Sequence, residues 1–248
     1  MADFIDIHCH ILPGLDDGAK NWEETLAMAR QAVDDGIRLV IATPHQSEQY
    51  PTNTAHRIVE LVFEARRRFE HERLPLEILP GADIRVNEEV VTKISRGELV
   101  TLGNHCKHIL LELPSDAVLP LCDLVFDLEL RGIRSILSHP ERNTALQEDI
   151  SSLEQLVTQG CLLQVTAGSF LGTFGRAARR TALRLLRAGM VHLVASDAHD
   201  TQHRPFVMSP AYNFLAGEIG PAAAEKICRT NSTLVSNGVE FDPPLPTF

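Results

Sequence analysis

The sequence has no long apolar run, no excess of positive charge and no cysteine framework. No stretch approaches the ~18 consecutive apolar residues that a membrane-spanning helix needs. Acidic residues outnumber basic ones, and the net charge of −10 argues against a nucleic-acid partner and against insertion at a membrane. A phosphorylated substrate stays possible, because bound metal ions would reverse the local charge.

The five cysteines are odd in number, scattered, and never spaced as CxxC, which argues against a set of disulfides. The first residues, MADFIDIHCH, lack the charged and apolar regions of a secretory signal. We therefore expect a cytoplasmic protein with reduced thiols.

Apolar, β-branched runs alternate with amphipathic stretches along most of the 248 residues. Strict alternation implies a parallel sheet with helical crossovers, and seven such units predict an α/β fold of the TIM-like barrel type. An open, doubly wound sheet is the alternative. The predicted strands are residues 4–7, 37–42, 76–79, 108–113, 133–137, 161–165 and 191–195. The predicted helices are residues 22–35, 54–73, 88–95, 119–131, 152–159, 176–188 and 221–229.

Residues able to bind metal follow or end six of these seven strands. Parallel α/β folds build their sites at the carboxyl ends of the strands, so these side chains are expected to meet there. The first strand leads into His8 and His10, whose spacing of two places both rings on one face. Asp197 and His199 repeat that spacing after the last strand.

Each motif also has a purely structural interpretation. Two histidines in HxH can be satisfied by hydrogen bonds, and Asp16 and Asp17 in PGLDDGA are ordinary turn residues. Glu112 is more telling, because a carboxylate inside the apolar strand ILLELP is rarely buried without a partner. Asp83 in GADIR could be a solvated loop residue. The occurrence of all these motifs in one chain favours metal binding over the structural interpretation of each motif alone.

The number of candidate ligands predicts more than one ion. A catalytic metal takes about three protein ligands and keeps one position open, so nine candidates suit two or three ions. Imidazole and carboxylate ligands without cysteine fit Mn, Fe or Zn. Arg142 and Arg204, if they face inward, would bind phosphate oxygens; a surface position is the alternative for either. The candidate ligands are His8, His10, Asp17, His45, Asp83, Glu112, His139, Asp197 and His199.

The order HxH, TPH, GxD, a strand glutamate, SHPER and SDAH resembles the PHP superfamily of polymerase-associated and histidinol phosphatase domains. DIHCHILPGLDDGAKNWEET, with SHPERN and ASDAHD, is similar more narrowly to the CpsB/YwqE family of bacterial manganese-dependent protein-tyrosine phosphatases. The resemblance covers about residues 4–240.

The resemblance implies a distorted seven-stranded β/α barrel of the PHP type, with residues 1–248 as one phosphoesterase domain. It implies Mn²⁺ in a three-metal site formed by the nine candidate ligands, with Arg142 and Arg204 binding the phosphate of the substrate. His199 is a further catalytic candidate that could supply a proton, but a histidine nitrogen bound to metal cannot donate one, so the general acid stays unassigned. The substrate would be the phosphotyrosine tail of a bacterial tyrosine autokinase that controls capsule or exopolysaccharide synthesis. Oligomers are possible. The family usually has glutamate in place of Asp83, and the shorter side chain could weaken one metal position.

Three alternatives stay open: a histidinol-phosphate phosphatase or other small-molecule phosphoesterase, an amidohydrolase, and a non-catalytic module. The ligand set and SHPER favour phosphate chemistry. Cysteine-based tyrosine phosphatases need an arginine six positions after the cysteine, and none is present. The residues at those positions are Leu15, Glu112, Leu128, Ala167 and Leu234.

Overall fold

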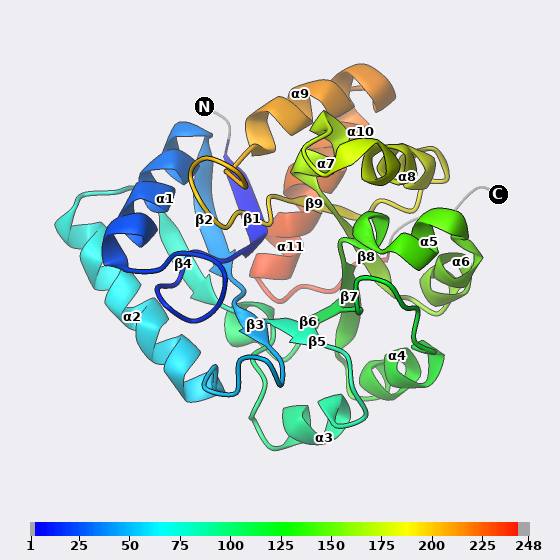
Figure 1. Cartoon of the computed structure of the whole chain (residues 1–248), viewed down its shortest axis with the longest axis horizontal. Coiled ribbons are helices and arrows are strands. Elements are labelled where there is room, and N and C mark those ends of the chain that lie inside the picture. Colours follow the sequence, from blue (N-terminus) through cyan, green and yellow to red (C-terminus); the bar gives the residue numbers. More distant parts are fainter. Residues whose placement is uncertain (1–2, 243–248) are drawn as a thin grey trace.

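A computed structural model describes residues 3–242 as parallel strands surrounded by helices (Figure 1). The ends of the predicted domain, residues 1–2 and 243–248, lie outside the described part. The strands are β1 (Phe4–Cys9), β2 (Ile37–Ala42), β3 (His45–Gln46), β4 (Glu77–Pro80), β5 (Asp83–Arg85), β6 (His108–Glu112), β7 (Arg134–Ser138), β8 (Leu162–Thr166) and β9 (Leu193–Ala195). The α-helices are α1 (Trp22–Asp34), α2 (Ala55–His71), α3 (Val90–Ser95), α4 (Cys122–Glu129), α5 (Thr144–Glu148), α6 (Ser151–Thr158), α7 (Ala167–Leu171), α8 (Gly175–Arg187), α9 (Met208–Ile219), α10 (Pro221–Glu225) and α11 (Asn231–Ser236).

All paired strands run parallel, in a sheet of order β1-β2-β4 and a second of order β3-β5-β6-β7-β8-β9. Backbone hydrogen bonds join β1 to the end of β9: the Asp197 amide donates to the His8 carbonyl at 2.8 Å and the His10 amide to the Ala198 carbonyl at 2.8 Å. The predicted barrel and its seven strands are confirmed. The open-sheet alternative is wrong, because the first and last strands meet.

Two short strands that the sequence did not predict distort the barrel. The chain leaves β2, passes Pro44 and enters β3; it leaves β4, passes Gly81 and enters β5. A Cβ on Gly81 would lie 2.7 Å from a methyl carbon of Ile41, so only glycine fits this crossing without a shift. In the β3–β5 pair, His45 lies directly beside Asp83.

The barrel interior changes from apolar to polar towards the carboxyl ends of the strands. Leu110 and Ile136 lie in the buried interior cluster, while Glu112 and Ser138 follow two positions later on the same strands. Since strand side chains alternate between faces, the residues two apart share the inner face. The interior cluster is Ile5, Ile7, Leu39, Ile41, Leu102, Leu110, Ile136, Leu162, Leu193, Ala195 and Val235.

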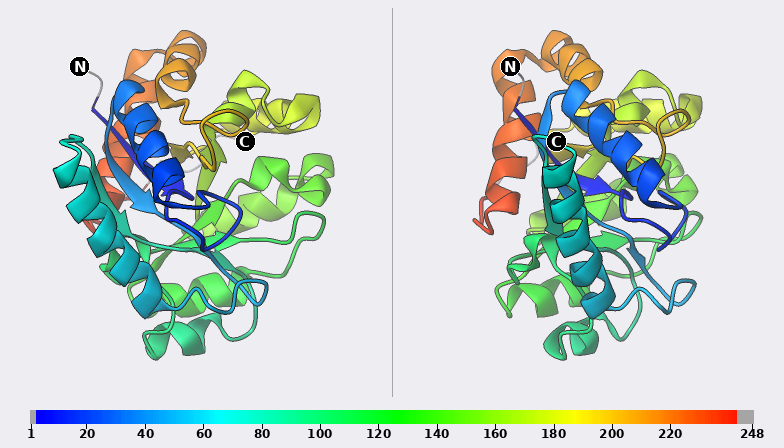
Figure 2. Two further views of the ribbon diagram at one scale, coloured as in Figure 1. Left: turned by 60° about the vertical axis from the view of Figure 1, so that its left-hand side comes forward. Right: turned by 90° about the vertical axis from the view of Figure 1, so that its left-hand side faces the viewer.

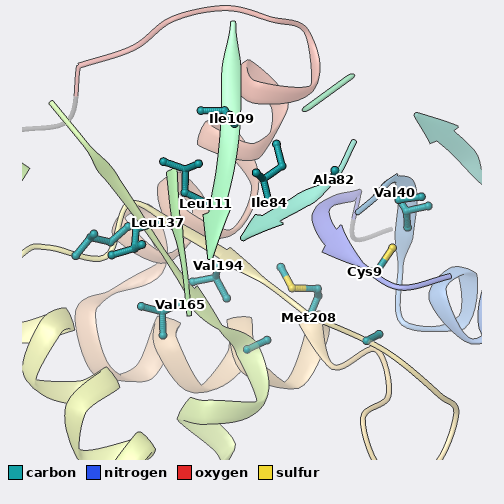
Figure 3. Close-up of a cluster of buried hydrophobic side chains, with 14 of the residues drawn as sticks. Cys9, Val40, Ala82, Ile84, Ile109, Leu111, Leu137, Val165, Val194 and Met208 are labelled. Carbon is teal, nitrogen blue, oxygen red and sulfur yellow. The ribbon is translucent and has the colours of Figure 1, made fainter. Parts of the chain in front are cut away.

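Outward-facing strand residues pack beneath the helices. Ile109 and Leu111 of β6, Val165 of β8 and Val194 of β9 lie in this larger cluster, with Met208 of α9 packed among them (Figure 3). Cys9 belongs to the same cluster, and its Sγ is 3.6 Å from the Ile41 carbonyl oxygen. It therefore points away from its neighbouring histidines, as the alternation of strand side chains predicts.

The helices largely follow the sequence prediction. Asn21 accepts a hydrogen bond from the Glu24 amide at the start of α1, and Thr54 caps α2 in the same way through the Arg57 amide. The last predicted helix, residues 221–229, is too short: α10 continues through a π-helical turn, Lys226–Thr230, into α11.

The segment after Asp200 contains helix α9, which the sequence did not predict. The Asp35 carboxylate accepts hydrogen bonds from the amides of Met208 and Ser209 at 2.6 and 3.1 Å. This cap comes from a residue more than 170 positions away, so no local sequence signal reveals it. α5 and α7 were also not predicted, and each spans only five residues.

The loops that follow the strands gather on one side of the barrel. Figure 2 shows α10 and α11 on the side opposite the loops after β1 and β3. None of the helices between residues 3 and 242 combines the length and apolar character that crossing a bilayer requires.

We expect Leu110→Ala to lower the free energy of unfolding by about 2–5 kcal/mol, because it leaves a cavity in the fully buried barrel interior. Leu130→Ala is the matched control: the same change at a side chain 68% exposed should cost under ~0.5 kcal/mol. Urea unfolding of both variants measures the difference. Equal losses would contradict this description of the core.

Candidate metal centre

The nine predicted ligands converge at the carboxyl ends of the strands. Each supplies at least one nitrogen or oxygen to a group whose atoms lie within 4.8 Å of one another. Most of these side chains are buried, and each group combines imidazole with carboxylate. The groups are His10, Asp17, His45 and His199; His8, His10 and Asp197; His8, Asp83 and His139; and His45, Asp83 and Glu112.

Asp197 lies at the centre of the first cluster of contacts. Its Oδ1 is 3.2 Å from Nε2 of His8, 3.4 Å from Nε2 of His10 and 3.6 Å from Nδ1 of His199. The side chain is 1% exposed. The β1 and β9 ends therefore deliver the two spaced motifs, HxH and DxH, to one point.

Asp83 lies at the centre of a second set of contacts at the barrel mouth, the end of the barrel formed by the carboxyl ends of the strands. Its Oδ2 is 3.6 Å from His8, 3.5 Å from His45 and 3.7 Å from His139, measured to the ring nitrogens. The Glu112 carboxylate is 3.5 Å from His45 and 3.7 Å from His139. The aspartate arm, although shorter than a glutamate, reaches the cluster because β5 carries it into the barrel mouth.

Asp17 lies at the rim, with its side chain 52% exposed. Its Oδ1 is 3.4 Å from Nε2 of His199 and 3.6 Å from Nε2 of His45. The turn PGLDDGA therefore does more than reverse the chain: it carries a carboxylate to the edge of the histidine cluster.

Apart from the distance to Nδ1 of His199, which lies 3.0 Å from the Asp197 carbonyl oxygen, these separations fit shared metal ions better than direct hydrogen bonds. Two ligands on one ion, each about 2.1 Å from it, lie roughly 3 Å or more apart. Within residues 3–242, Oδ2 of Asp83 and Nε2 of His199 are buried and have no hydrogen-bond partner. Such orphaned buried atoms carry a desolvation penalty that a bound cation would remove.

Hydrogen bonds to Nδ1 of His10 and of His8 orient the two rings and determine which nitrogen faces the cluster. His10 donates from Nδ1 to Oδ2 of Asp16 at 2.7 Å, and His8 donates from Nδ1 to Oε1 of Gln164 at 2.9 Å. The Nε2 atoms of both rings then face Asp197, the side from which a metal would bind. Sequence reasoning treated Asp16 as a turn residue and passed over Gln164, since neither contact follows a local pattern.

The pKa values separate candidate ligands that are neutral imidazoles near pH 7 from candidates that a metal would have to deprotonate. Burial lowers the pKa of His45 and of His139 to about 4, so both rings are neutral ligands at neutral pH. Burial, reinforced by the Asp83 charge, raises the pKa of Glu112 to about 8. Burial alone would lower the pKa of His10, but the Asp16 and Asp197 carboxylates outweigh it and raise that pKa to about 10.

Buried polar contacts hold the loops that carry the ligands. His139 and Asp197 have φ angles of 35° and 53°, a left-handed conformation that non-glycine residues seldom adopt. Asp6 anchors the second loop: its carboxylate accepts hydrogen bonds from the amide of Ser196 at 2.9 Å and from the Ser196 hydroxyl. Burial raises the pKa of Asp6 to about 7. Asp6 is a further supporting residue that motif reading missed.

Both candidate phosphate-binding arginines point into the site. Arg142 and Arg204 donate to the same oxygen, Oδ2 of Asp197, at 2.6 Å for Arg204. Their side chains are 25% and 24% exposed, and both contact a side chain of the cluster; their role in binding phosphate stays a prediction. The cluster therefore has a basic rim beside its acidic and imidazole interior.

A parallel β/α barrel with this ligand set at the carboxyl ends of its strands is typical of metal-dependent hydrolases. The family model for capsular polysaccharide synthesis, CpsB/CapC, matches residues 4–236. The chain belongs to the CpsB/CapC family.

Similar proteins include the tyrosine-protein phosphatase YwqE of Bacillus subtilis, 39% identical over 98% of this chain and 96% of that protein. The tyrosine-protein phosphatase CpsB of Streptococcus agalactiae is 26% identical over 92% of this chain and 96% of its own length. A crystal structure from work on YwqE of Bacillus subtilis and CpsB of Streptococcus pneumoniae, described as metal-dependent tyrosine phosphatases, superimposes with a TM-score of 0.92 at 37% identity. The match covers 98% of this chain and 99% of that one.

We expect Asp16→Asn to weaken metal binding about 10–100-fold, because an amide cannot orient the His10 ring as the carboxylate does. Asp34→Asn, on the exposed end of α1, is the matched control and should bind metal as the wild type does. The test is to dialyse both variants to equilibrium and to measure the metal that each retains by mass spectrometry. Equal retention by the two variants would show that Asp16 is only a turn residue.

Metal affinity should fall as the pH is lowered. With pKa values of about 8 and 10, Glu112 and His10 hold protons near pH 7 in the metal-free chain, and the metal must displace them. Titration calorimetry in two buffers of different ionisation enthalpy should detect about one to two protons released per chain. An absence of proton release would contradict the role of these two groups as ligands.

Proposed function

We propose that the nine-residue cluster is the catalytic centre at which this chain hydrolyses phosphotyrosine in a protein substrate. As a member of the CpsB/CapC family, the chain is a metal-dependent tyrosine-protein phosphatase. The observation that carries the assignment of the centre is the position of Asp197. One of its oxygens faces the histidines while the other accepts from two arginines.

The proposed cofactor is two or three Mn²⁺ ions, with Fe or Zn as alternatives. Imidazole and carboxylate donors without thiolates support this choice. Four overlapping ligand groups support a multinuclear site. When bound, the ions would supply an activated water by lowering its pKa to about 7 and would offset negative charge on the phosphoryl group.

Arg142 and Arg204 are proposed to bind the phosphoryl oxygens. Arginine presents several donors in one plane, a geometry that matches two phosphate oxygens. These arginines share a rim with the ligand cluster, so a phosphate held by them would lie against it. Fixed donors placed where charge develops stabilise the transition state without reorganising.

His199 is proposed to act as a metal ligand rather than as the general acid that protonates the leaving phenol. Its Nδ1 is 3.0 Å from the Asp197 carbonyl oxygen, which can only accept, so Nδ1 carries the proton. The Nε2 lone pair then faces the ligand cluster near Asp17. A ligand nitrogen cannot donate a proton. The leaving phenol, with a pKa of about 10, needs little acid assistance.

The proposed partner is the phosphorylated tyrosine tail of a tyrosine autokinase that acts in capsule or exopolysaccharide synthesis, in the cytoplasm. The family model's connection to capsular polysaccharide synthesis supports this partner. The acidic net charge of −10 supports a protein rather than a nucleic-acid substrate.

We expect strong chelator to abolish hydrolysis of a phosphotyrosine peptide, and added Mn²⁺ to restore it. The same preparation should act far more slowly on histidinol phosphate. Release of inorganic phosphate measures both reactions. Undiminished turnover in chelator would eliminate the proposed chemistry, and faster hydrolysis of histidinol phosphate would favour the small-molecule alternative.

A further inference from the structure

We propose that Phe174 is a positioning residue that holds Arg142 and Arg204 ready for the phosphate of the substrate. The Cζ atoms of these arginines lie 4.4 and 5.8 Å from the centroid of the same Phe174 ring. Guanidinium groups within about 6 Å of an aromatic ring are attracted by its quadrupole. The inference rests on the proposed phosphate-binding function of the two arginines.

An aromatic ring and a hydrogen-bond acceptor contact different parts of a guanidinium group. Hydrogen bonds leave along the edges of the plane, whereas an aromatic ring packs against its face. The contact with Asp197 occupies edge donors of both arginines, and phosphate would compete for those donors. The Phe174 ring has no hydrogen-bonding group, so it does not compete for those donors. Phe174 can therefore keep both arginines in place while their donors turn from Asp197 to phosphate.

The loop that carries Phe174 is built to present it. Gly172 and Gly175, on either side of it, have φ angles of 92° and 86°, which glycine adopts without strain. The Thr173 amide donates to the Gly168 carbonyl at 2.9 Å, closing the loop on α7. A Cβ on Gly168 would lie 3.2 Å from Cε2 of Phe174, so glycine there leaves room for the ring.

A buried carboxylate ties this loop to the one that carries Arg142. Glu141, next to Arg142, accepts hydrogen bonds from the Thr166 amide at 3.1 Å and from the Ser169 hydroxyl at 2.7 Å. Glu141 is 0% exposed. Glu141 therefore holds the start of α7 against the SHPER loop. The Phe174 ring, which follows α7, contacts Arg142 of that same loop.

The test compares Phe174→Leu and Phe174→Met, which remove the ring, with Phe174→Tyr, which keeps it. Phe63→Leu is the matched control: that ring lies 5.4 Å from Arg66 on the surface of α2, away from the ligand cluster. Calorimetry on the Mn²⁺-loaded proteins measures the Kd of inorganic phosphate. Steady-state assays measure KM and kcat with a phosphotyrosine peptide, and mass spectrometry measures bound metal.

Phe174→Leu and Phe174→Met should each weaken phosphate binding about tenfold and raise KM by a similar factor. Metal content should stay at the wild-type value. Phe174→Tyr and Phe63→Leu should bind phosphate within about twofold of the wild type. A purely structural role would lower the thermal midpoint without changing phosphate affinity.

Arg142→Met separates the inference from the proposed function. If Arg142→Met weakens phosphate binding and neither Phe174→Leu nor Phe174→Met does, the positioning role is overturned and the arginine function stands. If none of the three variants weakens it, the arginine function falls as well. Loss of phosphate affinity in Phe174→Tyr equal to that in Phe174→Leu would also overturn the role of the ring.

Discussion

The carboxylate of Asp197 is the interaction on which the rest of the site depends. One oxygen lies 3.2–3.6 Å from three imidazoles, and the other accepts from two arginines. Burial opposes its charge, but the nearby His8, Arg142 and Arg204 hold its pKa well below the usual value. Asp197 thus joins the side of the site that would hold metal to the side that would hold phosphate.

The distortion of the barrel helps to bring the histidines and carboxylates of the site together. Short strands β3 and β5 bring His45 and Asp83 side by side at the barrel mouth, where straight continuations of β2 and β4 would not pair them in the second sheet. Beneath them, the apolar interior cluster fills the barrel. Burying several carboxylates and imidazoles together is costly without cations. The fold therefore supports, at one end, a cluster that needs metal to be satisfied.

The sequence predicts the main strands because they are buried on both faces and read as apolar, β-branched runs. It also predicts which histidine and carboxylate side chains gather, because side chains at the carboxyl ends of parallel strands lie at one end of the barrel. It could not predict β3 and β5, which exist only through pairing with distant strands. The sequence did not reveal the supporting contacts of Asp16, Gln164 and Phe174 for a similar reason. Their contacts with His10, His8 and the arginines join segments that no local pattern relates.

Anomalous X-ray scattering at the manganese edge, from crystals grown with Mn²⁺, tests the central claim most directly. The account predicts two or three peaks, each within coordinating distance of at least three of the nine ligand side chains, with one beside Oδ1 of Asp197. Peaks confined to other parts of the molecule, with the His8, His10 and Asp197 group left without one, would contradict it.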